Sequence, residues 1–205
     1  MNKYVIEFIG TFFLVLVVGL TGNPIAIGVI LAAMVYMGGY ISGGHYNPAV
    51  TLGVLLQKKI ASTEAGIYML VQLFAAICAA GVYQIIHGSK MIVTPGIGVH
   101  FGAALLVEIL FTFALVSVVL HTAVNKKNKG NHYYGIAIGF VLMAAAFAGG
   151  QISGGAFNPA VGLGPNIYNL SYLSTHISNL WLYLIGPFVG GIIASLVYSY
   201  TSQEK

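Results

Sequence analysis

Two asparagines occupy the same short setting in the two halves of this chain. Asn47 and Asn158 each follow Ile-Ser-Gly-Gly and two further residues, and each precedes Pro-Ala-Val. Asparagine caps helix N-termini and proline is favoured at the first helical position, so each motif predicts the start of a short helix. The amide then offers a donor beside the positive helix end, where a neutral polar solute is held and a cation is repelled. The motif residues are Asn47, Pro48, Ala49, Asn158, Pro159 and Ala160.

The glycine pairs before these motifs suit an unwound backbone. Glycine adopts conformations that other residues resist. Unwound backbone at membrane depth is tolerated only where it is buried in protein or lines water. We therefore expect a ladder of carbonyl acceptors leading to the asparagines. The predicted acceptors are the carbonyls of Gly43, Gly44, His45, Gly154, Gly155 and Ala156.

The composition indicates which elements must position these groups. The 205 residues are 58% hydrophobic and 6% charged, whereas about a quarter of a soluble domain is charged. This predicts an integral, multi-pass membrane protein with about six spans of about 20 residues each. The net charge of +4 comes from scattered lysines and indicates no nucleic-acid surface. The expected spans are residues 4–20, 24–40, 63–86, 100–121, 133–149 and 179–200.

The chain contains an internal duplication. Residues 26–53 and 137–164 agree at 17 of 28 positions when they are aligned without a gap. Each half (about 1–86 and about 100–205) then holds three spans and one short helix that begins at its asparagine. Because three is odd, the halves enter the membrane in opposite orientations, which is the geometry of an inverted repeat.

The lysines orient the spans. With the N-terminus inside, seven of the eight lysines face the cytoplasm and only Lys90 lies outside. This asymmetry follows the positive-inside rule. We expect both termini to be cytoplasmic, and we expect the membrane to be the cell (plasma) membrane.

Three ionisable residues lie near the predicted path. Glu7 and Glu108 each begin a Glu-x-x-x-Thr-Phe sequence inside an apolar run. Carboxylates inside spans are functional by default, and a proton relay is one alternative for them. His45 precedes the first asparagine motif, where it lines the inner part of the path or acts as a pH gate.

The whole chain resembles the aquaporin (major intrinsic protein) family. The stretches that carry the resemblance are EFIGTF, GGHYNPAVT, EILFTF, GGAFNPAV and GPFVGG. It implies six spans, two half-helices, and a homotetramer with one pore in each subunit. It also implies that Glu7 and Glu108 accept hydrogen bonds from the buried backbone of the re-entrant loops.

The resemblance also locates an outer filter. In that family four positions form it, and they correspond here to Ile27, Ala146, Gly155 and Val161. Most members have Arg directly after the second Asn-Pro-Ala, where this chain has Val161, and the chain contains no arginine. Water-selective members typically carry an aromatic residue at the position of Ile27 and His at that of Ala146. The resemblance thus implies a small, apolar, uncharged filter with broader permeability to neutral solutes.

The sequence predicts an all-α membrane protein in which residues 1–205 form one channel domain, with six transmembrane helices and two re-entrant half-helices. We expect passive passage of water and small uncharged solutes, with ammonia, urea, glycerol, hydrogen peroxide and metalloid acids as candidates, and exclusion of ions and protons. No residue pattern indicates an enzyme, a cofactor or a metal site. The alternatives are a strict water channel, a closed junctional or adhesive membrane protein of the same fold, and a coupled transporter.

Overall fold

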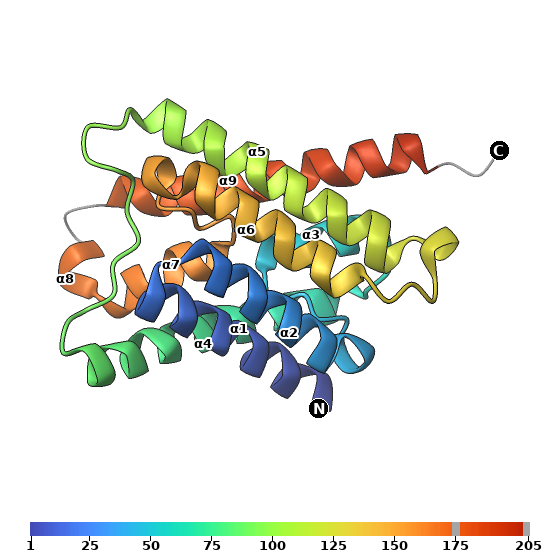
Figure 1. The fold of residues 1–205 in the computed structure, drawn as a ribbon, viewed down its shortest axis with the longest axis horizontal. Coiled ribbons are helices and arrows are strands. Elements are labelled where there is room, and N and C mark those ends of the chain that lie inside the picture. Colours follow the sequence, from blue (N-terminus) through green and yellow to red (C-terminus); the bar gives the residue numbers. More distant parts are fainter. Residues whose placement is uncertain (174–176, 203–205) are drawn as a thin grey trace.

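Six long helices dominate the structure, a computed structural model that describes residues 1–173 and 177–202. All six are long and apolar enough to cross a membrane, and the described residues include no strand. The all-α class and the six spans are therefore as predicted. The helices run roughly along the long axis of the molecule (Figure 1). They are α1 (Asn2–Thr21), α2 (Pro24–Ser42), α4 (Ser62–His87), α5 (Phe101–Val119), α6 (Tyr134–Ser153) and α9 (Ile177–Thr201).

Two shorter helices begin at the asparagine motifs. These are α3 (Pro48–Leu56) and α7 (Pro159–Tyr168), and each has proline at its first position. At 9 and 10 residues they are too short to span a bilayer. Figure 1 shows α3 and α7 toward opposite ends of the molecule, as expected for half-helices that enter from opposite faces.

The long helices pack in an open ring. Helix α4 packs on α1, α1 on α2, α2 on α6, α6 on α5, and α5 on α9. The half-helices α3 and α7 both contact α4 and α9 and so close the ring. Helices α2 and α6 approach closely because Gly28 faces Gly139: a Cβ on Gly28 would lie 2.6 Å from the Gly139 carbonyl oxygen. Small residues allow such backbone contact between membrane helices.

Several helix ends differ from the predicted ones. Helix α2 continues to Ser42 and α6 to Ser153, whereas we expected them to end at residues 40 and 149. The extension occurs because Gly43 and Gly154 act as left-handed C-caps, each donating its N–H to the carbonyl oxygen of the residue four positions earlier.

Helix α5 continues as a π-helical turn, η1 (Leu120–Val124). Two further short helices, η2 (Lys126–Asn128) and α8 (Leu170–Leu173), were not predicted. Lys205, counted among the inside lysines, lies outside the described residues.

Candidate pore

The predicted asparagines cap the two half-helices. The side-chain oxygen of Asn47 accepts a hydrogen bond from the Ala49 N–H at 2.8 Å. That of Asn158 accepts from the Ala160 N–H at 2.9 Å. Both side chains are therefore held by their own helix, as the sequence indicated.

The same asparagines also cross-link the two halves. Asn47 Nδ2 donates to the carbonyl of Phe157, and Asn158 Nδ2 donates to the carbonyl of Tyr46, each at 2.9 Å. An amide has two donor hydrogens, and among the described residues each Nδ2 has only this one acceptor. Both asparagines line the central cavity described below, so the second hydrogen is free for a solute.

Glu7 collects four donors in the first half. It is fully buried. Its Oε1 accepts from the Ser42 hydroxyl at 2.7 Å and from the His45 N–H at 2.9 Å. Its Oε2 accepts from the Tyr46 N–H at 2.7 Å and from the Gln72 amide at 2.8 Å. The carboxylate thus satisfies backbone donors of a buried loop that has no helical partners for them.

Glu108 makes the equivalent contacts in the second half. It too is fully buried. Its Oε1 accepts from the Ser153 hydroxyl at 2.7 Å and from the Ala156 N–H at 3.0 Å. Its Oε2 accepts from the Phe157 N–H at 2.7 Å. The geometry in both halves fits the bracing role that the resemblance implied.

The glycine pairs adopt the backbone expected of them. The φ angles are 91° at Gly43, 64° at Gly44, 87° at Gly154 and 65° at Gly155. These values lie in the left-handed region that favours glycine. The backbone N–H groups of the two loops bond inward to serine and glutamate oxygens. Within the described part of the chain no hydrogen bond reaches the six carbonyls predicted to line the path.

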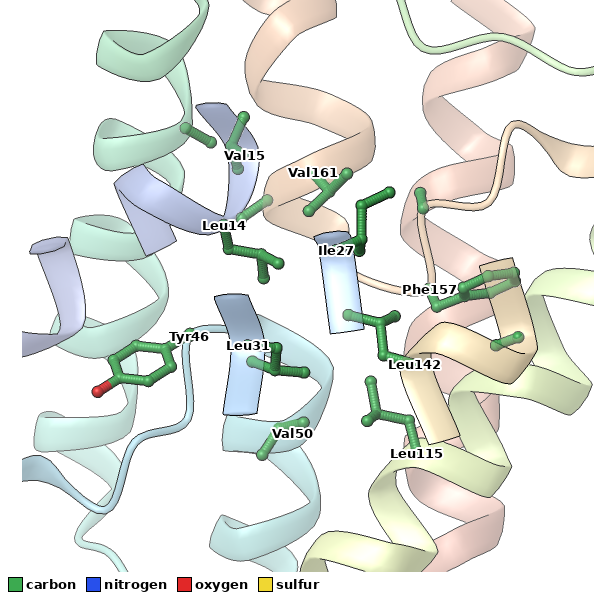
Figure 2. Close-up of a cluster of buried hydrophobic side chains, with 14 of the residues drawn as sticks. Leu14, Val15, Ile27, Leu31, Tyr46, Val50, Leu115, Leu142, Phe157 and Val161 are labelled. Carbon is green, nitrogen blue, oxygen red and sulfur yellow. The ribbon is translucent and has the colours of Figure 1, made fainter. Parts of the chain in front are cut away.

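A narrow cavity runs between the half-helices. Its volume is about 20 Å³, room for one or two water molecules. Its lining residues come largely in pairs related by the internal duplication. Figure 2 shows several of the aliphatic ones facing a common column, with Val161 and Val50 at opposite ends of it. The pairs are Leu14 and Leu115, Val18 and Val119, Ile27 and Ile138, Leu31 and Leu142, Gly44 and Gly155, His45 and Ala156, Asn47 and Asn158, and Val50 and Val161.

A wider vestibule adjoins each end of this cavity. The vestibule at the end that the lysines predict to face outward, here called the outer vestibule, has a volume of about 500 Å³ and shares Val18, Ile27 and Gly155 with the central cavity. The inner vestibule, of about 540 Å³, shares His45 and Val119 with it. The shared lining residues show that the three cavities adjoin one another, with the central cavity between the two vestibules.

The four predicted filter positions lie at the outer junction. Ile27 and Gly155 line both the central cavity and the outer vestibule. Val161 lines the central cavity, and Ala146 lines the outer vestibule. The structure therefore brings all four together, and none of them carries a charge.

Among the described residues that line the three cavities, charged side chains occur only in the inner vestibule. They come from Lys59, Lys126, Lys129 and Glu64, and Glu64 also pairs with Lys3 at 2.6 Å. No group of three His, Cys, Asp or Glu side chains that could hold a metal is found among the described residues. Among the described residues, the narrow part of the path is thus lined by uncharged side chains.

Three features of the path were not predicted from the sequence. One is the set of aliphatic pairs, which the offsets of 101 and 111 residues between the halves could have revealed. Another is the cross-link between the asparagines and the opposite half, for which the sequence carries no signal. The third is an outer strap, residues 91–94, which lines the outer vestibule. Buried Asn166 on α7 holds it: its Nδ2 donates to the Val93 carbonyl at 2.8 Å and its Oδ1 accepts from the Val93 N–H at 3.2 Å.

Comparison with known proteins agrees with this geometry. The pattern of the family described as "Major intrinsic protein" matches residues 19–198. A probable aquaporin TIP-type from Medicago truncatula is 40% identical over 185 residues, covering 88% of this chain and 71% of that protein. Aquaporin NIP1-4 from Oryza sativa subsp. japonica is 32% identical over 209 residues, covering 94% and 74%.

A solved structure shares the fold. The X-ray structure of the aquaglyceroporin from Plasmodium falciparum superposes with a TM-score of 0.75 and covers 95% of each chain. Its sequence is 20% identical. At that identity the likeness concerns the arrangement of the helices and carries no information about the solute.

Proposed function

This chain belongs to the major intrinsic protein family of membrane channels, and we propose that it conducts water and small uncharged solutes passively through the path described above. The observation that carries the proposal is the series of three adjoining cavities, with two asparagine donors in the smallest one. A solute with both donor and acceptor groups exchanges its hydration for these amides and for the free carbonyls of the loops. A cation meets the positive ends of α3 and α7.

The range of solutes follows from the outer junction. Ile27, Ala146, Gly155 and Val161 present no charge and no hydrogen-bonding side chain, which supports passage of neutral solutes beyond water. Ammonia, urea, glycerol, hydrogen peroxide and metalloid acids are the candidates. One observation favours a strict water channel instead: the central cavity has a volume of only about 20 Å³.

Assembly and location are part of the same proposal. We propose a homotetramer with one pore per subunit, embedded in the lipid bilayer with both termini cytoplasmic. The side of the membrane is supported by the lysines of the inner vestibule and the loops beside it. The cell membrane remains our prediction for the compartment.

Flux through the purified protein in lipid vesicles tests the function. Osmotic shrinkage should be faster in vesicles that hold the protein than in empty ones, and it should not depend on an ion gradient. Asn47→Asp and Asn158→Asp each replace a donor amide with an acceptor that faces a carbonyl. We expect water flux to fall about tenfold, a barrier increase of about 1.4 kcal/mol, or cation leak to appear.

Asn23→Asp is the matched control. Asn23 caps the exposed start of α2, where aspartate caps equally well. This variant should conduct as the parent does. If vesicles with the folded parent protein shrink no faster than empty ones, the channel proposal fails. The result would then favour the alternative of a closed junctional or adhesive membrane protein.

A further inference from the structure

The wall of the central cavity is nearly the same in both halves. Eight pairs of residues related by the duplication line it, and seven of the eight pairs are identical. The exception is His45, whose counterpart is Ala156. A cavity of two identical halves has no preferred end for selecting solutes, and among the eight pairs that line the central cavity this is the one that makes its two ends chemically different.

His45 lies where selection would act. It lines both the central cavity and the inner vestibule, and so stands at their junction. Among the described residues, two other kinds of polar side chain line the central cavity: the two asparagines, and Tyr46, whose hydroxyl is already used as a donor to the Met34 carbonyl at 2.9 Å. The counterpart at the outer end, Ala156, offers a methyl group.

The imidazole is held in place rather than free to swing aside. Its Nδ1 lies 3.1 Å from the hydroxyl of Thr51, and its ring meets that of Tyr68 edge-on, with centroids 5.3 Å apart. Thr51 and Tyr68 are 0% and 1% exposed. The counterpart of Thr51 in the second half is Gly162, so the ring and the group that anchors it are absent there together.

The surrounding hydrogen bonds also select the tautomer. Thr51 Oγ1 donates to the Asn47 carbonyl at 3.0 Å and accepts from the Gln72 amide at 3.1 Å. When its one hydrogen goes to the Asn47 carbonyl, the shortest of the contacts in which it can donate to an oxygen, the His45 Nδ1 is the donor in the contact with Thr51. The Nε2 is left as an acceptor. A single fixed acceptor at the junction can hold a water or ammonia molecule that passes in file.

We infer that His45 is the specificity-determining residue of this pore, and that it places the principal selection step at the inner end. Thr51 is its positioning residue. The inference rests on the proposed function, because selection has meaning only if the path conducts. It refines that proposal: the uncharged outer junction admits neutral solutes, and the imidazole then favours small ones over urea and glycerol.

Substitution by the residue of the other half tests the inference. Flux of water, urea and glycerol is measured on reconstituted protein, and the ratio of urea or glycerol flux to water flux is compared. His45→Ala should raise this ratio about two- to tenfold, the range set by one hydrogen bond to a passing solute. Val119→Ala is the matched control, because Val119 lines the same junction without a polar group. It should raise the ratio less.

Thr51 supplies the second variant. Thr51→Val keeps the shape but removes the hydroxyl that anchors the ring, so the ratio should move in the same direction as in His45→Ala. Thr51→Ser retains the hydroxyl and should restore the parent ratio. If the role of Thr51 is purely structural, Thr51→Val should lower the melting temperature but leave the ratio of urea or glycerol flux to water flux as in the parent.

The outcomes separate the inference from the function beneath it. If the parent conducts water and His45→Ala leaves the ratio unchanged, the selection step lies elsewhere and the inference is wrong. If Val119→Ala raises the ratio as much as His45→Ala, width alone selects and the role of the imidazole is wrong. If the parent protein conducts nothing, the channel proposal itself fails.

Discussion

Val161 occupies the place where most members of the family carry arginine. The side chain lines the central cavity beside Ile27 and Gly155, and no charged residue lines that cavity. Val161→Arg should narrow the outer junction and add a fixed charge. A charge within about 4 Å of a passing cation contributes up to about 4 kcal/mol at an effective dielectric of about 20. Urea and glycerol flux should therefore drop more than water flux, and any cation leak should fall.

Val161→Met separates length from charge at the same position. It should reduce the flux of large solutes without affecting cation leak. Stopped-flow measurements on reconstituted protein give both quantities. An Arg variant that folds, yet leaves the ratio of large-solute to water flux unchanged, would show that the outer junction is not a filter.

The sequence predicted which residues supply chemical groups to the path better than it predicted the partners that those residues contact. The motifs predicted that both asparagines begin short helices, and they do. The resemblance supplied the filter positions and the role of the carboxylates, which stay predictions. The partners of Asn47 and Asn158 could not be predicted, because each amide bonds to a carbonyl more than 100 residues away. Such a contact depends on how two half-helices meet, and no local pattern records it.

The re-entrant loops depend on one carboxylate each. Replacing Glu7 by Leu leaves the N–H groups of His45 and Tyr46 without an acceptor, at about 1–3 kcal/mol for each buried donor. Glu7→Gln keeps one acceptor and should cost less. Because Glu7 accepts four hydrogen bonds and Glu108 three, Glu7→Leu should also cost more than Glu108→Leu. Melting temperature in detergent measures this order.

Glu64 provides the control for that series. It is a partly exposed carboxylate that pairs with Lys3. Exposed pairs contribute little to stability, about 0–1 kcal/mol. Glu64→Leu should therefore shift the melting temperature least. Equal melting temperatures for Glu7→Gln and Glu7→Leu would contradict the bracing role.

Helix existence was easier to predict than helix ends. Runs of apolar residues long enough to cross a bilayer gave all six spans. The ends of α2 and α6 were placed too early, because Ile-Ser before a glycine pair looks too polar for a helix in lipid. The hydroxyls of Ser42 and Ser153 bond to Glu7 and Glu108, so these polar side chains face the protein interior and not the lipid.

The outer surface of the molecule reverses the pattern of a soluble protein. Large apolar side chains are exposed on every long helix, whereas Glu7, Gln72, Glu108 and both pore asparagines are buried. A surface of this kind is stable in lipid, where polar backbone must be satisfied inside the protein. The composition predicted a membrane protein, and the exposed apolar surface is consistent with that prediction. The sequence could not predict the narrowness of the path, because that depends on how aliphatic side chains from four long helices and two half-helices meet.

The lysines are distributed unequally between the two ends of the molecule, and this asymmetry predicts its orientation. Lys59, Lys126 and Lys129 line the inner vestibule, whereas Lys90 lies at the other end, where its Nζ donates to Asn169 at 3.2 Å. Lysine-rich loops are retained in the cytoplasm. Since Cys78 is the only cysteine, a Cys78→Ala background accepts single labelling sites. In intact cells a membrane-impermeant maleimide should label Lys90→Cys at once.

The matched site at the inner end is Lys127, which lies outside the lining of the inner vestibule, so that blocking the path does not affect the result. Lys127→Cys should be labelled only after the membrane is permeabilised, and the Cys78→Ala background alone should stay unlabelled under both conditions. If Lys127→Cys but not Lys90→Cys is labelled in intact cells, the topology is the reverse of the one predicted. The vestibule at the junction with His45 would then face outward, and the selection step inferred there would lie at the outer end of the path.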